Sequence, residues 1–224
     1  MVRHRWFFFA LFSLFRFSLS LGLIERPLFV GLLWGLSFGN LETSMLVAVF
    51  FELLWLDFIP VGTFIPPHTT AATFTALALC SYFGLDSLPL ASLALAAGLP
   101  MAWMGTRLER IMRDRLNRSY SGVLQWVRKP ADVAVPGRLL MWTLISKLLA
   151  NWLFFLIGAG LLASAVHFVL HQYGPTLASC RISWSELLLA ASVGGLLALR
   201  LRSLYVALAG GGIVLGVLRL LGIF

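Results

Sequence analysis

Two carboxylic acids, Glu52 and Asp57, interrupt an otherwise apolar stretch of the sequence. An ionisable side chain at the centre of a bilayer costs about 3 kcal/mol on insertion scales, so chains keep one mainly where it faces a polar cavity or a partner. Asp57 follows Glu52 by about 140° around a helix, which excludes a paired acid–base site on one face. We therefore expect Glu52 to mark the function, and Asp57, close to Pro60, to lie at the membrane interface.

Aromatic and aliphatic residues flank Glu52, with Phe50 and Phe51 before it and Trp55 shortly after it. A carboxylate accepts hydrogen bonds from sugar hydroxyls, and an aromatic ring can cover the apolar face of a sugar. The same carboxylate could instead form a structural hydrogen bond to another helix. The residues alone leave both interpretations open.

The composition indicates a polytopic membrane protein. Of 224 residues, 60% are hydrophobic and 12% are charged, whereas soluble domains have about 25% charged residues. The net charge of +8 does not indicate nucleic-acid binding, because the arginines lie between apolar segments, where they orient the chain and contact lipid phosphates. Cys80 and Cys180 have no metal-ligand spacing, and we expect both to be unpaired.

Eight apolar segments follow one another along the chain, and a full crossing needs about 20 helical residues. They are residues 6–23, 27–41, 43–59, 69–83, 88–104, 139–170, 186–199 and 204–221. We expect an all-α fold in which the first segment is an uncleaved membrane helix, the pair 69–83 and 88–104 is joined by a turn, and 139–170 is one long tilted helix.

A basic segment, residues 105–138, separates an N-terminal membrane half (1–104) from a C-terminal one (139–224). It carries eight cations and three anions, and the positive-inside rule places it in the cytoplasm. Its first half is either an amphipathic helix on the inner leaflet or a solvated loop.

The number of crossings in the N-terminal half also constrains the fold. Arg3 and Arg5 favour an inside N-terminus, and five full crossings would then put the basic segment outside. One segment must therefore turn back. The short, Gly-rich segment 27–41 and its neighbour are expected to form a re-entrant, broken-helix element, because irregular backbone at membrane depth must be shielded by protein or line a cavity.

Three glycines, Gly31, Gly35 and Gly39, recur at every fourth residue and would form a smooth helix face for close backbone packing. Asn40 follows them and needs a hydrogen-bond partner in lipid. His68 begins a span after two prolines, a position where an interfacial polar group is commoner than a ligand. The sequence has no phosphate loop, nucleophile motif or metal-ligand spacing, so we expect no catalytic residue, no metal and no cofactor.

Residues 25–78 resemble the membrane-embedded IIC subunit of the mannose/fructose/sorbose family of bacterial sugar phosphotransferase systems. The resemblance covers about 60 residues in order and spacing. It rests on Arg26-Pro27-Leu28, the glycine repeat with a polar residue after it, Glu52-Leu53, Ile59-Pro60-Val61-Gly62, and Ile65-Pro66-Pro67 followed by a polar residue.

The resemblance implies a multi-pass protein of the bacterial inner membrane that pairs with a second membrane subunit, IID, in an oligomeric complex and binds a hexose. Translocation would be coupled to phosphorylation by cytoplasmic IIB, which IIA recharges, so the chain itself would be a non-catalytic permease subunit. Glu52 matches the family's intramembrane glutamate, and Asn40 and His68 stand where the family commonly has Asp. With Thr63, these two are expected to be secondary sugar contacts.

Two other functions remain open at this point. The loss of two acidic residues near the expected sugar site is compatible with a non-transporting scaffold or regulatory subunit that recruits IIB-like proteins through its basic segment. A proton-coupled secondary transporter that uses Glu52 as its proton carrier is the other alternative.

Overall fold

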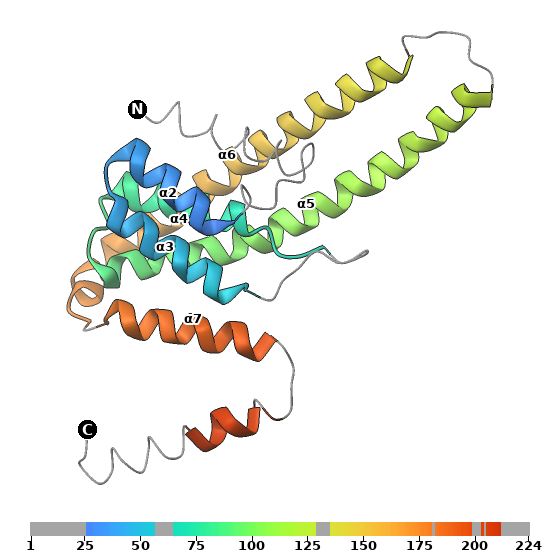
Figure 1. Ribbon diagram of the computed structural model, residues 1–224. Helices are drawn as coiled ribbons and strands as arrows, with labels where there is room; N and C mark the ends of the chain where they lie inside the picture. The colour runs from blue at the N-terminus through green and yellow to red at the C-terminus, as the bar shows by residue number, and fades with distance from the viewer. Residues whose placement is uncertain are drawn as a thin grey trace.

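The structure, a computed structural model, describes residues 26–56, 65–128, 135–180, 182–198, 203 and 205–211. Within these ranges the regular elements are all helices (Figure 1). They are α2 (Pro27–Phe38), α3 (Leu41–Leu54), α4 (Thr69–Phe83), α5 (Leu88–Arg128), α6 (Val135–Ala178) and α7 (Trp184–Ala198). The all-α prediction is confirmed, whereas the expected first helix, residues 6–23, lies outside the described residues.

Two helices, α5 and α6, are much longer than the rest. With 41 and 44 residues they extend about 60 and 65 Å, twice the roughly 30 Å of a bilayer core, and both contain a stretch apolar enough to span a membrane. The first part of α5 and the last part of α6 pack with α2, α3 and α4 in a bundle. The last part of α5 and the first part of α6 project together from this bundle and form what we call the arm (Figure 1).

The arm contains most of the basic segment. Because α5 continues without a break to Arg128, the first half of this segment is helical, which is one of the two structures considered for it. The long helix expected over 139–170 is also present, as the central part of α6.

The connection between α4 and α5 agrees with the turn predicted from its composition. Gly84 ends α4 with φ +63° and donates its backbone N–H to Cys80 O, a helix end that glycine adopts without steric cost. Helix α5 begins at Leu88. Both ends of the predicted turn therefore agree with the structure.

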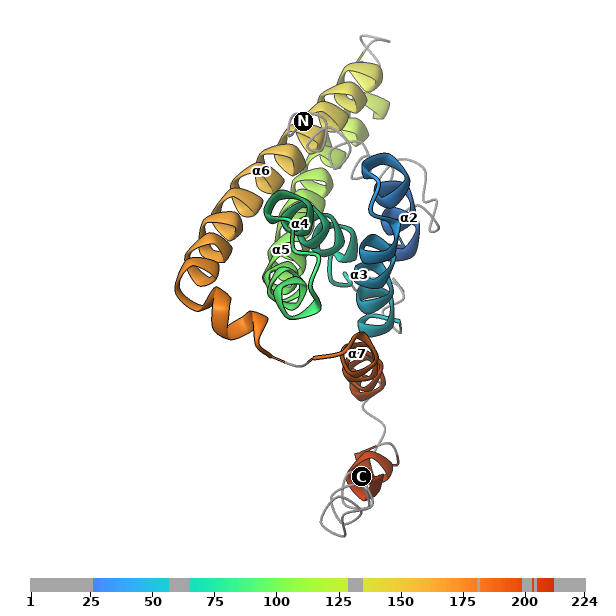
Figure 2. The same ribbon diagram turned by 90° about the vertical axis from the view of Figure 1, so that its left-hand side faces the viewer.

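Helices α2 and α3 form a hairpin that is too short to cross a bilayer. Their 12 and 14 residues give lengths of about 18 and 21 Å, and they lie side by side in both views (Figure 2). Gly39, with φ +83°, ends α2 and donates to Gly35 O, and Asn40 begins α3 directly afterwards. The two short helices, broken at Gly39, agree with the broken-helix element expected from the first half of the chain, and its re-entrant path stays a prediction.

The glycine repeat has two roles rather than one. A Cβ on Gly31 would overlap that of Ala48, and a Cβ on Gly35 would lie 2.7 Å from the Leu41 Cα, so both glycines allow α2 to pack closely on α3. Gly39 has nothing within 4 Å of such a Cβ. The prediction of a common packing face was therefore wrong for Gly39, which ends the helix instead.

Contacts at Gly98 show how deep the hairpin reaches into the bundle. An added Cβ on Gly98 would lie 2.8 Å from Phe51 Cζ and 2.9 Å from Ala72 O, so α3, α4 and α5 meet at this level. Gly98 is ten residues, or about 15 Å, beyond the start of α5 at Leu88. If α5 enters the membrane at its first residue, the end of α3 lies near the middle of the bilayer.

Candidate functional site

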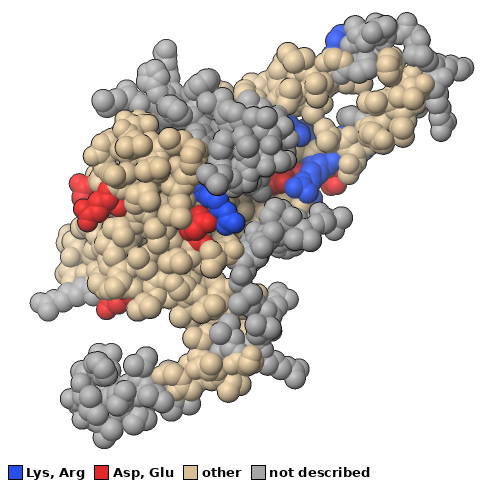
Figure 3. Space-filling view, viewed as in Figure 1, with Lys and Arg blue, Asp and Glu red and all other residues tan. Residues whose placement is uncertain are grey.

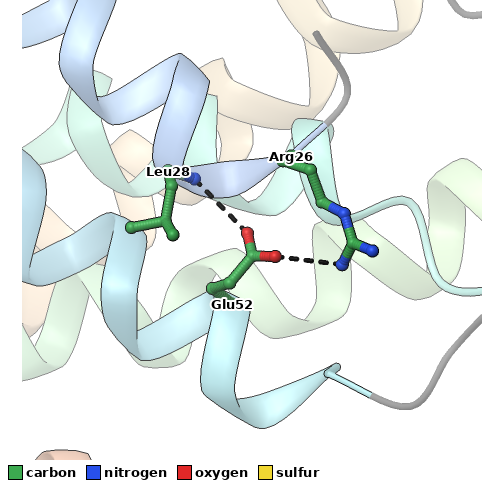
Figure 4. Close-up of polar contacts among 3 residues, drawn as sticks. All are labelled: Arg26, Leu28 and Glu52. Atoms are coloured by element: carbon green, nitrogen blue, oxygen red, sulfur yellow. Dashed lines mark hydrogen bonds and ion pairs between the residues drawn. The ribbon is translucent and has the colours of Figure 1, made fainter. Parts of the chain in front are cut away.

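Glu52, in the last turn of α3, is bound by the start of α2. Its Oε1 accepts a hydrogen bond from Arg26 Nη1 at 3.0 Å, and its Oε2 accepts one from the Leu28 backbone N–H at 3.4 Å (Figure 4). The Glu52 side chain is 12% exposed and that of Arg26 is 51% exposed. The carboxylate therefore faces neither open lipid nor bulk water but a cationic partner and a helix end.

The start of α2 is suited to hold a negative charge. Arg26 is its N-cap residue and has extended backbone, Pro27 has no N–H, and Leu28 carries one of the N–H groups that a helix leaves without an internal partner. The macrodipole adds positive potential at the same place. Discontinuous helices in transporters build substrate sites in the same way, by directing a helix N-terminus at a polar group.

The aromatic residues before Glu52 belong to the core of the bundle. Phe50 and Phe51 are 9% and 0% exposed, and the Phe51 ring stacks on Trp55 with centroids 5.4 Å apart. Since the Phe51 tip also meets Gly98 of α5, these phenylalanines do not provide an open surface for a sugar.

His68 is buried, at 2% exposure, as the N-cap of α4. Its Nδ1 accepts from the Ala71 N–H at 3.1 Å, and its own backbone N–H donates to Ala102 O at 3.2 Å. An added Cβ on Gly105 would lie 2.7 Å from the His68 Cβ, so this glycine makes room for the imidazole. His68 thus caps a helix inside the bundle, about 10 Å along α5 from the level of Glu52.

The capping role predicts how His68 variants behave. His68→Ala should destabilise the protein by about 1–2 kcal/mol, because the Ala71 N–H loses its acceptor and the space beside Gly105 empties. His68→Asn should recover much of this loss, because asparagine is a preferred N-cap residue. Thermal unfolding of the purified variants tests this. Equal destabilisation by both substitutions would contradict the capping role.

Asn40 lies at the opposite end of α3 from Glu52. Its Oδ1 accepts from the Thr43 N–H at 3.4 Å, and its Nδ2 donates to Asp86 Oδ1 at 3.0 Å. Twelve residues of helix, about 18 Å, separate it from Glu52. The structure thus gives Asn40 the partner that its position demands, and it does not bring Asn40 and Glu52 together.

This separation gives a second prediction. Asn40→Ala should lower stability by about 1 kcal/mol through loss of the helix cap, while the affinity for sugar stays within about twofold of the unchanged protein. Sugar titration at a fixed temperature, together with thermal unfolding, measures both effects. A large loss of sugar affinity without a loss of stability would instead support the expected sugar contact of Asn40.

The remaining site residues divide into two groups. Thr63 and Asp57 lie outside the described residues.

Arg26 was not predicted as a site residue, although it stands at the start of the Arg-Pro-Leu motif that carries the family resemblance. An arginine directly before a short apolar helix is the signal that could have identified it. No cluster of three potential metal ligands occurs among the residues described.

Comparison with known proteins agrees with the resemblance of the sequence. A family model described as the sorbose-specific IIC component of the phosphotransferase system (PTS) matches residues 6–178, more than half of the chain. Neither the search of curated proteins nor that of solved structures gave a significant match. The matched region contains the α2–α3 hairpin, the Arg26–Glu52 pair and both long helices. The chain belongs to the family of sorbose-specific IIC components and is a membrane component of a sugar phosphotransferase system.

Proposed function

We propose that the chain is the sugar-translocating IIC subunit of such a system, and that a hexose binds at the Arg26–Glu52 pair. The observation that carries this proposal is the position of Glu52: its carboxylate meets the N-terminus of a short helix, next to a half-exposed arginine. The half-exposed guanidinium leaves an opening to the pair from outside the bundle. A substrate site needs that opening.

The pair suits a neutral, hydroxyl-rich ligand. Each sugar hydroxyl can both donate and accept a hydrogen bond, while a carboxylate only accepts and a guanidinium only donates. Two hydrogen bonds occupy Glu52, and a carboxylate can accept about four, so acceptor sites remain for sugar hydroxyls. Because the two charges cancel, a neutral sugar can bind without leaving a net charge in the membrane.

The arm fits the proposed coupling to cytoplasmic IIB. In the face shown in Figure 3, basic side chains lie where the arm leaves the bundle, with acidic side chains among them, and further acidic side chains lie at the opposite edge of the bundle. The positive-inside rule places such a surface in the cytoplasm. IIB would supply the phosphoryl group there, IID would complete the translocation unit, and the complex would reside in the bacterial inner membrane.

Calorimetric titration of sugars into the purified IIC–IID pair tests this function. A sugar-translocating subunit gives saturable heat with at least one hexose, and reconstituted uptake then requires IIA, IIB and a phosphoryl donor. A scaffold would give no saturable heat with any hexose. Accumulation of unmodified sugar driven by a proton gradient alone would instead support a secondary transporter.

A further inference from the structure

An open cavity of about 450 Å³ lies between the end of α3, the middle of α5 and α7. Its walls are Leu54 and Trp55 of the α3 end, Leu99, Pro100 and Trp103 of α5, and two small residues of α7. The volume is in the usual range for small-molecule sites, roughly 300–1,000 Å³. The lining side chains are all apolar apart from the two indole N–H groups. A sugar here would leave most of its hydroxyls without partners, at a large free-energy cost.

Close packing of α7 on α3 forms one side of this cavity. A Cβ on Gly195 would overlap the backbone oxygen of Leu53, and one on Gly194 would lie 3.0 Å from Leu54 Cδ1. The glycines bring the two backbones into contact, and the neighbouring Ala198 is too small to fill the space that opens toward α5. The result is an apolar hollow on the surface of a membrane protein, where lipid is the surrounding medium.

The same face of α5 changes from apolar to basic just beyond the cavity. Leu99, Trp103 and Arg107 follow at four-residue intervals and therefore lie on one face of the helix. Arg107 and Arg110 are both exposed. Arg107 lies 19 residues, or about 28 Å, beyond Leu88, so a bilayer core of about 30 Å that begins at Leu88 would end near Arg107. Trp103, 71% exposed, lies one turn inside this boundary, at a depth that tryptophan favours.

We propose that this cavity binds an anionic phospholipid, with an acyl chain between α3, α5 and α7 and the headgroup phosphate on Arg107 and Arg110. Guanidinium groups bind phosphate through charge-assisted, often bidentate hydrogen bonds, and each basic residue near a membrane surface adds about 1 kcal/mol of attraction to anionic lipid. The acyl chain fills an apolar space that water would fill poorly. Through Leu54 and Trp55, the lipid supports the end of the helix that carries Glu52.

Lipid binding to the purified full-length chain tests this site. We expect phosphatidylglycerol to be retained through detergent purification, as detected by native mass spectrometry, and to raise the thermal unfolding temperature more than phosphatidylcholine does. The double variant Arg107→Gln/Arg110→Gln should bind phosphatidylglycerol at least about tenfold more weakly. The matched control Arg115→Gln/Arg118→Gln removes the same charge farther along the arm and should bind as the unchanged protein does.

A second variant tests the cavity separately from the charges. Ala198→Phe places a ring in the hollow and should lower retention of both lipids, while Arg107 and Arg110 remain in place. Unchanged phosphatidylglycerol binding in this variant and in the Arg107/Arg110 variant would overturn the proposal. Equal stabilisation by glycerophosphate, which has no acyl chain, would also overturn it. So would loss of lipid binding when IID is bound, which would make this surface a subunit interface.

Discussion

Glu52→Gln should lower sugar uptake and phosphorylation by the assembled system about 10- to 100-fold. Glutamine keeps the shape of the side chain but loses its negative charge, and hydrogen bonds to a charged group contribute about 1.5–3 kcal/mol each, with tenfold in rate or affinity for every 1.4 kcal/mol. Uptake of labelled sugar into vesicles that contain the partner subunits measures the effect. Glu42→Gln, the same substitution at an exposed position of the same helix, is the matched control and should leave uptake within about twofold.

A structural role of Glu52 is separated from a sugar-binding role by a second variant. Glu52→Gln alone leaves Arg26 without its counter-ion, which is destabilising wherever the charge is shielded from water. Arg26→Gln/Glu52→Gln removes both charges and should recover stability. If sugar binds at the pair, this double variant still fails to transport. Recovery of uptake together with stability would show that the pair serves only the fold.

The sequence predicted the elements near the site better than it predicted the contacts between them. The bounds of α4, residues 69–83, and the start of α5 at residue 88 follow from local signals, because an apolar run ends there at a turn with a glycine. Both predictions agree with the structure. Glu52 could be identified because a carboxylate in an apolar segment is costly whatever surrounds it. The contact between Glu52 and Arg26 could not be predicted, since Arg26 is 26 residues away and reaches Glu52 only because α2 and α3 fold back on each other.

The predictions for His68 and Asn40 show the same limit: the local sequence does not reveal contacts between distant parts of the chain. A polar residue just before an apolar run is compatible with a helix cap, an interfacial position or a ligand contact, and only the fold decides among them. His68 is buried because Gly105, 37 positions along the chain, leaves room for it, and Asn40 finds Asp86 because the hairpin tip meets the α4–α5 turn. Neither contact has a signal in the local sequence.

The change of composition after residue 104 marks a change of surroundings and not the end of a helix. Helix α5 continues through Gly105 into the arm, because single glycines weaken a helix without ending it. The mean hydropathy therefore changes within one continuous helix. Composition predicts that the chain leaves the membrane there, while the continuity of α5 and its length required the structure.

Gly31→Ala should be the most disruptive of the single-methyl changes in the hairpin. The added Cβ would overlap that of Ala48 and lie 2.8 Å from Ser44 O, and neither a methyl group nor a backbone carbonyl can move aside as a flexible side chain can. Helices α2 and α3 must therefore separate. Overpacking of this kind costs about 1–3 kcal/mol, partly offset by about 1 kcal/mol of better helix propensity for alanine, so we expect the thermal unfolding temperature to fall by several degrees.

The same separation should reach the proposed sugar site at Glu52. Gly31 lies one turn after Leu28, and Ala48 lies one turn before Glu52, so moving the helices apart draws the Leu28 N–H away from the Glu52 carboxylate, a contact already 3.4 Å long. We expect sugar affinity to fall several-fold even in protein that remains folded. Gly160→Ala is the control, because an added Cβ there has nothing within 4 Å and should be neutral or slightly stabilising. If Gly31→Ala kept full stability and affinity, the hairpin would not be packed as closely as the structure has it, and the helix start would not be what holds Glu52.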